Sequence, residues 1–455
     1  MINKKVIFIL VNEGVSARYF FHTNLYNLLN AYYKVIVLTK DKKVLEKNFL
    51  IKNSLIENYS ENFFYNSLYF IYDFFRQVRI LTFFDKKNHF SNYWRKFYFK
   101  SKNSLKKRIF FSSASLLSLL TSNIFLFHLL FNKLESYLVK KPNLFIYKKY
   151  NPDYLFTTSL GCLSNDAYFI HEAKKLNVKH CALILSWDNT TTKGPYLYYP
   201  DKVVAWTQLM KNELINFHRL NENKIFISGP LFFDYHKSLL RNKIIKSPTD
   251  KTIFLALESP TTFKNNIKLL KYVIRSIEKL NKIKLIVRLH PLTFKRDHNN
   301  KIINQKLLND INRIVKEYNF IELDCPHIIE SELSCLTTIN DSRGYVERLY
   351  KSDILIAYFS TLFLEASLFD IPCINISLAS RVNLHYKDLM NFYHNARVNN
   401  TGAITYVYNQ KELDNAIKMY LNNPKQNQKN RKELVNNECE PNIQDSVNKF
   451  LELNL

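Results

Sequence analysis

The chain has 455 residues, of which 47% are hydrophobic, so it can bury ample core and is expected to form two or three domains. Its 65 basic and 39 acidic residues give a net charge of +26, which favours an anionic partner such as nucleic acid, acidic lipid or a phosphorylated substrate. The six cysteines form no Cys-x-x-Cys pair and several lie in apolar runs, which argues for buried thiols rather than a disulfide framework.

The first predicted element is a buried strand over residues 6–11. We do not expect a cleavable signal here, because the apolar run is too short and no small-residue cleavage site follows it. Helical spacing follows over residues 18–31, and a second strand over 33–39 completes a βαβ unit. The loop after the first strand lies at the carboxyl edge of the sheet, where open α/β folds bind ligands. Glu13, Gly14 and Arg18 are therefore candidate site residues. The chain contains neither a Gly-x-Gly-x-x-Gly nor a phosphate-loop motif, which argues against dinucleotide oxidoreductases and P-loop NTPases.

Residues 62–149 interrupt this pattern with interleaved aromatic and basic side chains. Residues 76–149 hold 16 basic and 2 acidic residues, a net charge of +14. At their centre, residues 109–131 are 23 residues without a charge, enough to span a bilayer. We favour instead a helical insertion that rests on an anionic membrane surface, because predicted strands of one domain continue on both sides. Helices buried against the sheet are an equal alternative, and nucleic acid ranks lower because no known binding motif is present.

The α/β pattern resumes with a strand over 152–159, a helix over 165–176 and a strand over 178–186. The loop that follows is the most polar in the chain, SWDNTTTKGP. Asp188 is the predicted general base for an acceptor hydroxyl, Lys193 or the threonines are predicted to hold an anion, and Trp187 offers a stacking surface. An ordinary turn is the simpler alternative. The candidates on the acceptor side are Gly14, Arg18, Trp187, Asn189, Thr190 and Lys193.

A strand, a helix over 208–220 and the passage NKIFISGPLFFD close the first half, and Gly229 lies at its exit. A second βαβ series then begins. Its strand over 252–259 ends in Glu258, a helix follows over 265–280, and the strand over 282–291 carries Arg288 and His290 at its carboxyl end. A helix over 304–318, a strand over 319–324 and a short helix over 345–351 come next.

The run SDILIAYFSTLFLEASLFDIPCINIS, residues 352–377, reads as strand, turn, helix and strand. Ser360 or Thr361 would begin the helix, where free amides favour a phosphate. Glu365, one turn further, could accept hydrogen bonds from sugar hydroxyls. The simpler alternative makes Ser360 an N-cap and Glu365 a solvated helix residue.

These motifs resemble the GT-B glycosyltransferases. The His290-Pro291 pair, the run 352–377 and the passage NKIFISGPLFFD carry the resemblance. His-Pro followed by a Ser-Thr pair is also similar to bacterial polysialyltransferases and CDP-glycerol glycerophosphotransferases. The resemblance implies an α/β fold of two Rossmann-like domains that face one another across a cleft. It also implies that His290, Ser360 and Thr361 hold the donor phosphates and that Glu365 binds the donor ribose. Gly229, at the interdomain crossing, is a further candidate for donor and phosphate binding.

The residue chemistry agrees with this resemblance. Loss of a nucleoside phosphate builds negative charge, which His290, Arg288 and the turn at Ser360 could stabilise. Asp188 is the first choice for the acceptor base of an inverting transfer, and Glu13 the second. His290 could alternatively bond only a backbone carbonyl. No Asp-x-Asp pair is present and the histidines are scattered, so no metal or cofactor is expected beyond a nucleotide-activated sugar as co-substrate.

The expected domains are an acceptor domain over 1–238 with the insertion at about 62–149, a linker over 239–250, a nucleotide-donor domain over 251–430 and a C-terminal tail over 431–455. The expected function is transfer of a sugar from a nucleotide-sugar donor to a surface-polysaccharide or lipid-linked glycan, in the cytoplasm at the inner face of the membrane. Three alternatives remain: a CDP-polyol glycerophosphotransferase, a sugar-nucleotide 2-epimerase, and a non-enzymatic basic protein that binds membrane or nucleic acid.

Overall fold

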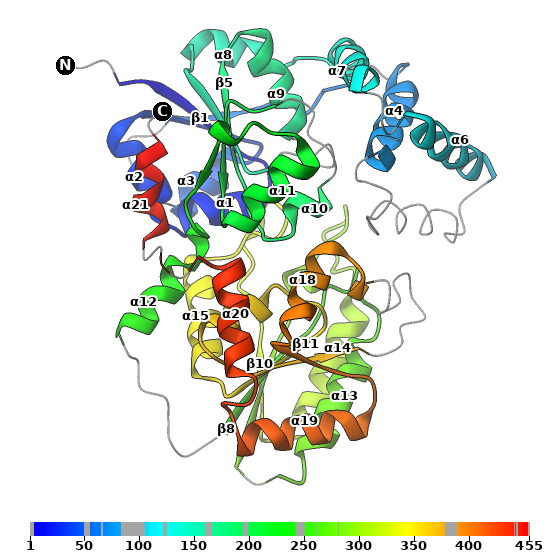
Figure 1. Ribbon diagram of the computed structural model, residues 1–455, viewed down its shortest axis with the longest axis vertical. Helices are drawn as coiled ribbons and strands as arrows, with labels where there is room; N and C mark the ends of the chain where they lie inside the picture. Colours follow the sequence, from blue (N-terminus) through cyan, green and yellow to red (C-terminus); the bar gives the residue numbers. More distant parts are fainter. Residues whose placement is uncertain are drawn as a thin grey trace. The chain divides into compact units, whose positions relative to one another are not determined.

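The computed structural model describes residues 4–49, 55–64, 67–82, 105–121, 125–159, 166–193, 199–242, 251–261, 263–280, 282–377, 389–440, 442 and 445–453. The chain forms two compact units, each built on one parallel sheet (Figure 1). Unit 1 contains Met1–Gly229, Ser331–Leu333 and Val447–Leu455, and unit 2 contains Pro230–Glu330 and Ser334–Ser446. The predicted α/β class with two Rossmann-like sheets is confirmed.

The described sheet of unit 1 has seven strands in the order β3-β2-β1-β4-β5-β6-β7, all parallel. Five of the six positions in each of the first two strands are buried, as expected for a parallel sheet covered on both faces. The strand order reverses between β1 and β4. The strands are β1 (Val6–Val11), β2 (Lys34–Thr39), β3 (Leu55–Asn58), β4 (Tyr154–Thr157), β5 (Lys179–Leu183), β6 (Lys202–Ala205) and β7 (Ile225–Ile227).

Helices of unit 1 cover this sheet with aromatic side chains, and the rings of Phe8 and Tyr147 lie 5.0 Å apart in the resulting core. The C-terminal residues also belong to this unit, where the rings of Phe450 and Phe156 lie 6.1 Å apart. The helices are α1 (Gly14–Phe21), α2 (Leu25–Tyr32), α3 (Lys42–Phe49), α8 (Leu144–Tyr150), α9 (Asp166–Lys175), α10 (Asn189–Thr192), α11 (Gln208–His218) and α21 (Ser446–Phe450), with 3-10 turns η1 (Glu222–Lys224) and η4 (Leu451–Leu453).

The single helix expected over 18–31 is two helices, α1 and α2. Thr23 separates them, because its Oγ1 donates to the carbonyl of Tyr19 at 2.6 Å and accepts from the amide of Leu25 at 3.2 Å. A hydroxyl that bonds the backbone in this way competes with continuous helical hydrogen bonding.

The predicted helical insertion is confirmed, but its uncharged run does not form one helix. The insertion contains α4 (Tyr69–Thr82), α6 (Leu105–Thr121) and α7 (Phe125–Leu138), and α4 packs against both others (Figure 1). The uncharged run is divided between α6 and α7, and residues 122–124 lie outside the described chain. Among the described helices, none combines the length and hydrophobicity needed to cross a bilayer.

Unit 2 has a described sheet of six parallel strands in the order β10-β9-β8-β11-β12-β13. The order reverses between β8 and β11, because the chain starts in the middle and builds first one side and then the other. The strands are β8 (Lys251–Ala256), β9 (Ile283–Arg288), β10 (Ile321–Asp324), β11 (Ile354–Ala357), β12 (Cys373–Ile376) and β13 (Ile404–Val407).

The largest core of unit 2 joins these strands to amphipathic helices. Leu269, Leu270, Val273 and Ile277 of α13 are buried at helical spacing against the strands. The helices are α12 (Asp234–Asn242), α13 (Asn266–Ile277), α14 (Gln305–Lys316), α15 (Ile339–Lys351), α16 (Leu362–Leu368), α18 (Tyr393–Thr401), α19 (Gln410–Asn422) and α20 (Gln428–Glu438), with η2 (Leu231–Phe233) and η3 (Pro291–Phe294).

Few glycines serve the tight turns of this protein, which has only six. Among the described residues, Gly229 and Gly402 have positive φ, at 78° and 66°. Ten other described residues adopt positive φ without being glycine, and four of them are asparagine, the residue that tolerates this region best. They are Asn151, Asn177, Arg219, Lys282, Asn300, Cys335, Phe359, Asp370, Asn427 and Glu440.

Candidate active site

The carboxyl edge of the unit 2 sheet brings three polar loops together. Ala256 pairs with Arg288 and Leu255 pairs with Ile356, so β8, β9 and β11 end at the same level. Adjacent strands lie about 4.8 Å apart, so the three loops begin within about 10 Å of one another. They also flank the point where the strand order reverses, which is the ligand site of open α/β sheets.

Glu258 occupies the central loop, directly after β8. Asn266 fixes this loop in two directions, because its Oδ1 accepts from the amide of Glu258 at 3.0 Å and its Nδ2 donates to the carbonyl of Glu258 at 2.9 Å. Burial raises the pKa of the half-buried Glu258 to about 8, although the Ser259 amide acts in the opposite direction. Glu258 can therefore carry a proton at neutral pH and donate it.

Tyr358 follows β11 and lies beside Glu258. Its side chain is only 5% exposed, its ring lies 4.6 Å from that of Phe263, and its hydroxyl has no hydrogen-bond partner among the described residues. Burial, and then the charge of Glu258, raise the pKa of Tyr358 above its usual value. Because buried hydroxyls without partners are rare, Tyr358 and Glu258 are candidate ligand contacts.

His290 follows β9, where the sequence predicts it. Its Nδ1 accepts a hydrogen bond from the amide of Leu292 at 3.0 Å at the start of η3. The neutral ring therefore carries its hydrogen on Nε2, which is the atom that can donate to a phosphate oxygen. The alternative, in which His290 only donates to a backbone carbonyl, concerns Nε2 and stays a prediction.

The Ser360 turn differs from the expected anion site at a helix N-terminus. Ser360 Oγ accepts from the amide of Leu362 at 3.3 Å, and the amides of Phe363 and Leu364 bond the carbonyls of Ser360 and Thr361. The helix they begin, α16, has only seven residues. Thr361, and not Ser360, is the N-cap residue of α16, and its side chain makes no capping hydrogen bond. The dipole of so short a helix adds little here. Phe359, just before the turn, holds a φ of 41°, a strained conformation for a bulky residue.

Glu365 is buried, and one of its two carboxylate oxygens is occupied by neighbouring side chains. The side chain is 5% exposed, and its Oε2 accepts from His236 Nε2 at 2.7 Å and from the Tyr345 hydroxyl at 3.0 Å. Both bonds fall on one oxygen. A ribose hydroxyl would have to use Oε1, so the predicted ribose contact depends on that atom alone.

Arg288 is held by carboxylates, which corrects its predicted role as a phosphate ligand. Its guanidinium donates to Asp324 at 2.9 Å and to both oxygens of Asp341 at 3.0 and 2.8 Å, and the side chain is buried. Arg348 also bonds Asp324. Burial acts to lower the pKa of Arg288, but these carboxylates raise it overall. Arg288 therefore joins β9, β10 and α15 and fixes the strand that carries His290.

In unit 1, the loops after β1 and β4 meet where the strand order reverses. Buried Asp166 joins them, because it accepts hydrogen bonds from the Asn12 side chain and from the amides of Thr158 and Ser159. Glu13 follows Asn12, is exposed, and has an extended backbone before α1. The fixed loop thus presents Glu13 at the ligand edge of the sheet.

Gly14 and Arg18 extend this edge along α1. Gly14 is buried at the first position of the helix. Arg18 is half-buried, and its Nε is a buried donor without a hydrogen-bond partner in the described chain. A buried unpaired guanidinium donor suits an anionic ligand, so Arg18 stays a prediction.

Asp188 lies in a loop whose own donors surround it. Ser186 and Asn189 donate to its Oδ1, and Thr192 Oγ1 donates to Oδ2 at 2.9 Å. The threonines of α10 also bond the Asp188 carbonyl. These contacts match the simpler interpretation of the loop as a turn, and the role of Asp188 stays a prediction.

Three other predicted residues in unit 1 have structural roles. Trp187 is only 6% exposed, so it cannot offer the expected stacking face. Thr190 is fully buried, donates to Glu213 and accepts from His218 Nε2 at 2.6 Å, which corrects its predicted acceptor contact. The Gly229 amide donates to the Trp206 carbonyl at 3.1 Å, so it is not available to a phosphate. Exposed Lys193 remains a prediction.

Two residues that the sequence interpretation did not single out organise these edges. Glu258 is an acidic residue directly after a buried strand, a signal available in the sequence. Asp166 has a weaker signal, since an acidic residue in the first turn of a helix usually serves only as a cap. The described residues include no group of three or more His, Cys, Asp or Glu that could hold a metal ion.

No protein-family model and no curated protein matches this sequence. Solved structures match it over nearly its whole length. S. aureus MnaA in a UDP co-structure has 12% identity over 98% of this chain and 95% of that chain, with a TM-score of 0.54. UDP-GlcNAc 2-epimerase from Neisseria meningitidis bound to UDP-GlcNAc has 11% identity over 98% of each chain, with a TM-score of 0.52.

The chain has a GT-B-like fold. A further UDP-N-acetylglucosamine 2-epimerase, with 11% identity over 99% of this chain and 95% of that chain and a TM-score of 0.50, shares it. The GT-B resemblance seen in the sequence motifs is confirmed at the level of the fold. Identities this low establish the fold alone, so the reaction must be argued from the residues.

Proposed function

We propose that the protein is a glycosyltransferase that moves a sugar from a nucleotide-sugar donor to a surface-polysaccharide or lipid-linked glycan. The observation that carries this proposal is the convergence of Glu258, His290 and Tyr358 where the strand order of unit 2 reverses. Open parallel sheets bind nucleotides at this edge. The bound UDP and UDP-GlcNAc in structures of the same fold support a nucleotide-sugar donor.

In the donor half of the reaction, protein side chains would donate protons or hydrogen bonds to the leaving group. As the bond between the sugar C1 and the phosphate oxygen breaks, negative charge grows on the departing nucleoside phosphate. The Nε2–H of His290 and the protonated carboxyl of Glu258 would stabilise that charge, and Glu258 would supply a proton to the phosphate.

The acceptor reaction would use a base from unit 1. Glu13 would take the proton of the acceptor hydroxyl as the acceptor oxygen bonds to C1 of the sugar, which gives an inverted product. Asp188, the first choice from the sequence, becomes the second, because neighbouring donors already occupy both of its oxygens.

A donor screen tests the proposal. The purified chain is incubated with UDP, GDP, CMP and dTDP sugars and with CDP-polyols, and released nucleotide is measured with and without glycan acceptors. We expect release with a nucleotide sugar, reduced about 10²-fold or more in Glu258→Gln and His290→Ala. The exposed residues Glu317→Gln and His298→Ala are the matched controls and should retain activity.

Other outcomes of the same screen assign the alternatives. Release only from a CDP-polyol would identify a glycerophosphotransferase. No release from any donor, with no change in any donor, would reject the enzymatic proposal.

Epimerisation of a UDP-N-acetylhexosamine is the second candidate, because the similar structures include UDP-GlcNAc 2-epimerases. It requires no acceptor. Proton NMR of UDP-GlcNAc incubated with the protein alone would detect a 2-epimer, and formation of that epimer without nucleotide loss would favour this reaction over transfer.

A further inference from the structure

The three helices of the insertion carry a large share of the exposed apolar surface. Of the 23 large hydrophobic side chains that are exposed in the described chain, 12 lie on α4, α6 and α7. These helices have a small core of their own, formed by Val78, Leu81, Ala114 and Phe131. Their exposed apolar residues are Tyr69, Phe70, Ile71, Leu105, Ile109, Leu116, Leu119, Leu120, Leu129, Leu130, Leu134 and Tyr137.

The polarity of α6 is inverted relative to a helix on a water-soluble surface. Its outward face carries Leu105, Ile109, Leu116 and Leu120, which are 73%, 58%, 62% and 68% exposed, with the exposed Ser112 and Ser113 between them. Spacings of four, seven and four residues place these side chains on one face at 3.6 residues per turn. Leucines on the outside of an amphipathic helix indicate an apolar environment.

The buried face of α6 consists of small and polar residues, Ala114, Ser115, Ser118 and Thr121. Two of these hydroxyls bond within the helix, because Ser118 Oγ donates to the Ser115 carbonyl and Thr121 Oγ1 to the Leu117 carbonyl, both at 2.7 Å. Small residues inside and leucines outside are the arrangement of helices that pack together against lipid.

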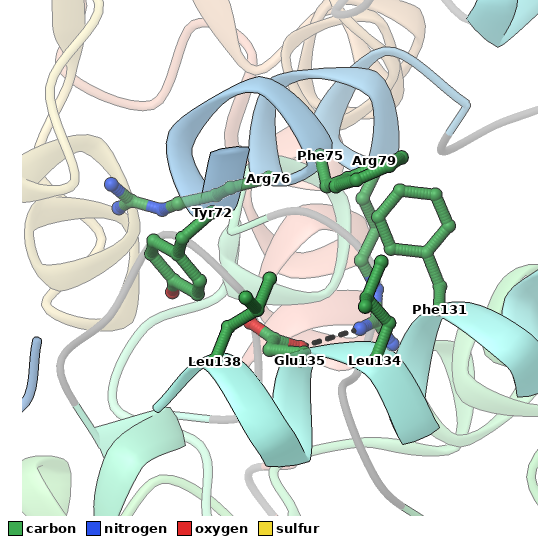
Figure 2. Close-up of a pocket in the computed structure, with 8 residues that line it drawn as sticks. All are labelled: Tyr72, Phe75, Arg76, Arg79, Phe131, Leu134, Glu135 and Leu138. Carbon is green, nitrogen blue, oxygen red and sulfur yellow. Dashed lines mark hydrogen bonds and ion pairs between the residues drawn. The ribbon is translucent and has the colours of Figure 1, made fainter. Parts of the chain in front are cut away.

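Helix α7 also has an exposed apolar stripe, and its one acidic side chain is buried. Leu130, Leu134 and Tyr137 form its exposed stripe. Glu135, the only acidic residue between positions 105 and 138, is buried and accepts from Arg79 of α4 at 3.0 Å. Figure 2 shows this ion pair between the two helices, beside a small pocket lined by Tyr72 and Phe131.

The charge left on the surface is positive. Lys106, Lys107 and Arg108 are exposed around the first turn of α6, and Lys133 is exposed on α7. Basic residues beside an apolar stripe complement anionic headgroups above acyl chains. A second copy of the same face would bring like charges together, so a lipid surface is the better partner.

We propose that α6 and α7 form a docking surface for an anionic lipid bilayer, with α6 lying in the plane of the interface and its leucine stripe among the acyl chains. Lysine and arginine side chains at the start of α6 contact the headgroups. The helices lie on the bilayer and do not cross it, which agrees with their length and polarity. This inference rests on the insertion alone and holds whichever reaction the protein performs.

Vesicle flotation with the full-length protein tests the docking surface. Vesicles of phosphatidylcholine alone are compared with vesicles that contain phosphatidylglycerol. We expect binding that is about 10-fold or more stronger to the anionic vesicles and that weakens as salt is raised from 0.05 to 0.5 M, values chosen to span strong and weak screening.

Two variants separate the apolar and charged contributions. Ile109→Ser/Leu116→Ser/Leu120→Ser should reduce vesicle partitioning about 30-fold or more, because three exposed side chains no longer enter the bilayer. Lys106→Glu/Lys107→Glu/Arg108→Glu should remove the preference for anionic vesicles. Circular dichroism and thermal melting should match the unmodified protein, since all six side chains are exposed.

Two control variants carry the same kinds of substitution at exposed positions outside α6. Phe145→Ser/Ile303→Ser removes two side chains that are 62% and 58% exposed, and Lys271→Glu/Arg275→Glu/Lys279→Glu reverses three exposed charges of unit 2. Both should bind vesicles as the unmodified protein does. The proposal is overturned if the protein does not float with anionic vesicles, if the α6 variants bind as tightly as the controls, or if the serine variant only converts a stable dimer to a monomer.

Discussion

Glu258 has an environment unlike that of an ordinary surface carboxylate. The bracket from Asn266 holds it at the carboxyl edge of β8, and burial keeps it protonated to about pH 8. A carboxylic acid with a raised pKa can act as a general acid at neutral pH. Its chemistry is set by the loop around it rather than by its residue type.

Activity should therefore depend on pH through Glu258. The protonated form is required, so kcat/KM of nucleotide release should be level near neutral pH and fall as pH rises through about 8. Glu258→Gln should lower the plateau and remove this alkaline limb, whereas Glu317→Gln should keep both. An alkaline limb that is unchanged in Glu258→Gln would assign it to another group.

Arg288 should contribute mainly to stability. Arg288→Ala leaves buried Asp341 without its arginine partner and removes one of the two arginines that bond Asp324, so we expect unit 2 to lose about 3–5 kcal/mol in urea denaturation. Arg313→Ala is the control, because its side chain is 72% exposed and its bond to Asp310 lies on the surface. A stable Arg288→Ala protein with weakened UDP binding would restore the phosphate-ligand role.

Sequence patterns predicted where the site residues lie better than what they contact. His290 was placed correctly at a strand end, because buried runs of apolar residues mark strands. The partners of Arg288 lie 36 and 53 positions away, and His236 lies 129 positions from Glu365. No local sequence pattern indicates such contacts. A single sequence therefore does not distinguish a charged residue in a buried ion pair from one that is exposed to a ligand.

At the scale of helices and strands, the buried strands of both sheets were predicted from apolar runs, and the break at Thr23 was not. A threonine that ends one helix and begins the next has the same letter as one inside a helix, and only its hydrogen bonds to Tyr19 and Leu25 distinguish it. The inverted polarity of α6 was also hidden, because spacing identifies a face but not the direction in which it points.

The clamp between α4 and α7 should hold the insertion together. Burial acts to raise the pKa of Glu135, but His171 and Arg79 outweigh it and leave that pKa below its usual value. Glu135→Ala removes the carboxylate that bonds the buried guanidinium of Arg79, at a cost of about 3–5 kcal/mol. Hydrogen exchange should rise in α4 and α7, while the exposed pair partner Glu61→Ala should leave exchange unchanged. Unchanged exchange in both variants would contradict the clamp.

Gly402 should be the least replaceable of the turn glycines. It ends α18 with a φ of 66°, and an added Cβ would lie 2.6 Å from Asn430 Nδ2. We expect Gly402→Ala to cost about 1–3 kcal/mol in thermal or urea unfolding. Arg219, which ends α11 with a φ of 55°, is the opposite case, and Arg219→Gly should cost nothing or stabilise by up to about 1 kcal/mol.

At the scale of the whole molecule, the nucleotide should protect unit 2. UDP at about 100 times its Kd should add about 2.7 kcal/mol to the unit that binds it. Hydrogen exchange should slow in the loops after β8, β9 and β11, and those loops carry Glu258, His290 and Ser360. Slowing confined to the unit 1 loops at Glu13 and Asp188 would reverse the assignment of the donor.

The division of the chain into units was only partly visible in the sequence. Two βαβ series predict two sheets, and that prediction is confirmed. The return of the C-terminus to unit 1 depends on a ring contact between Phe450 and Phe156, and nothing local to either residue announces it.

The ten non-glycine residues with positive φ in the described chain have a consequence for how this sequence can change over evolutionary time. Each holds a conformation that disfavours a side chain by up to about 1–2 kcal/mol, with asparagine the least affected. Glycine would adopt the same conformation without this energetic cost, but the chain has only six glycines. The free energy of unfolding that remains to tolerate random substitutions is therefore lower. Substitutions of these residues by glycine are the changes that would raise it most readily.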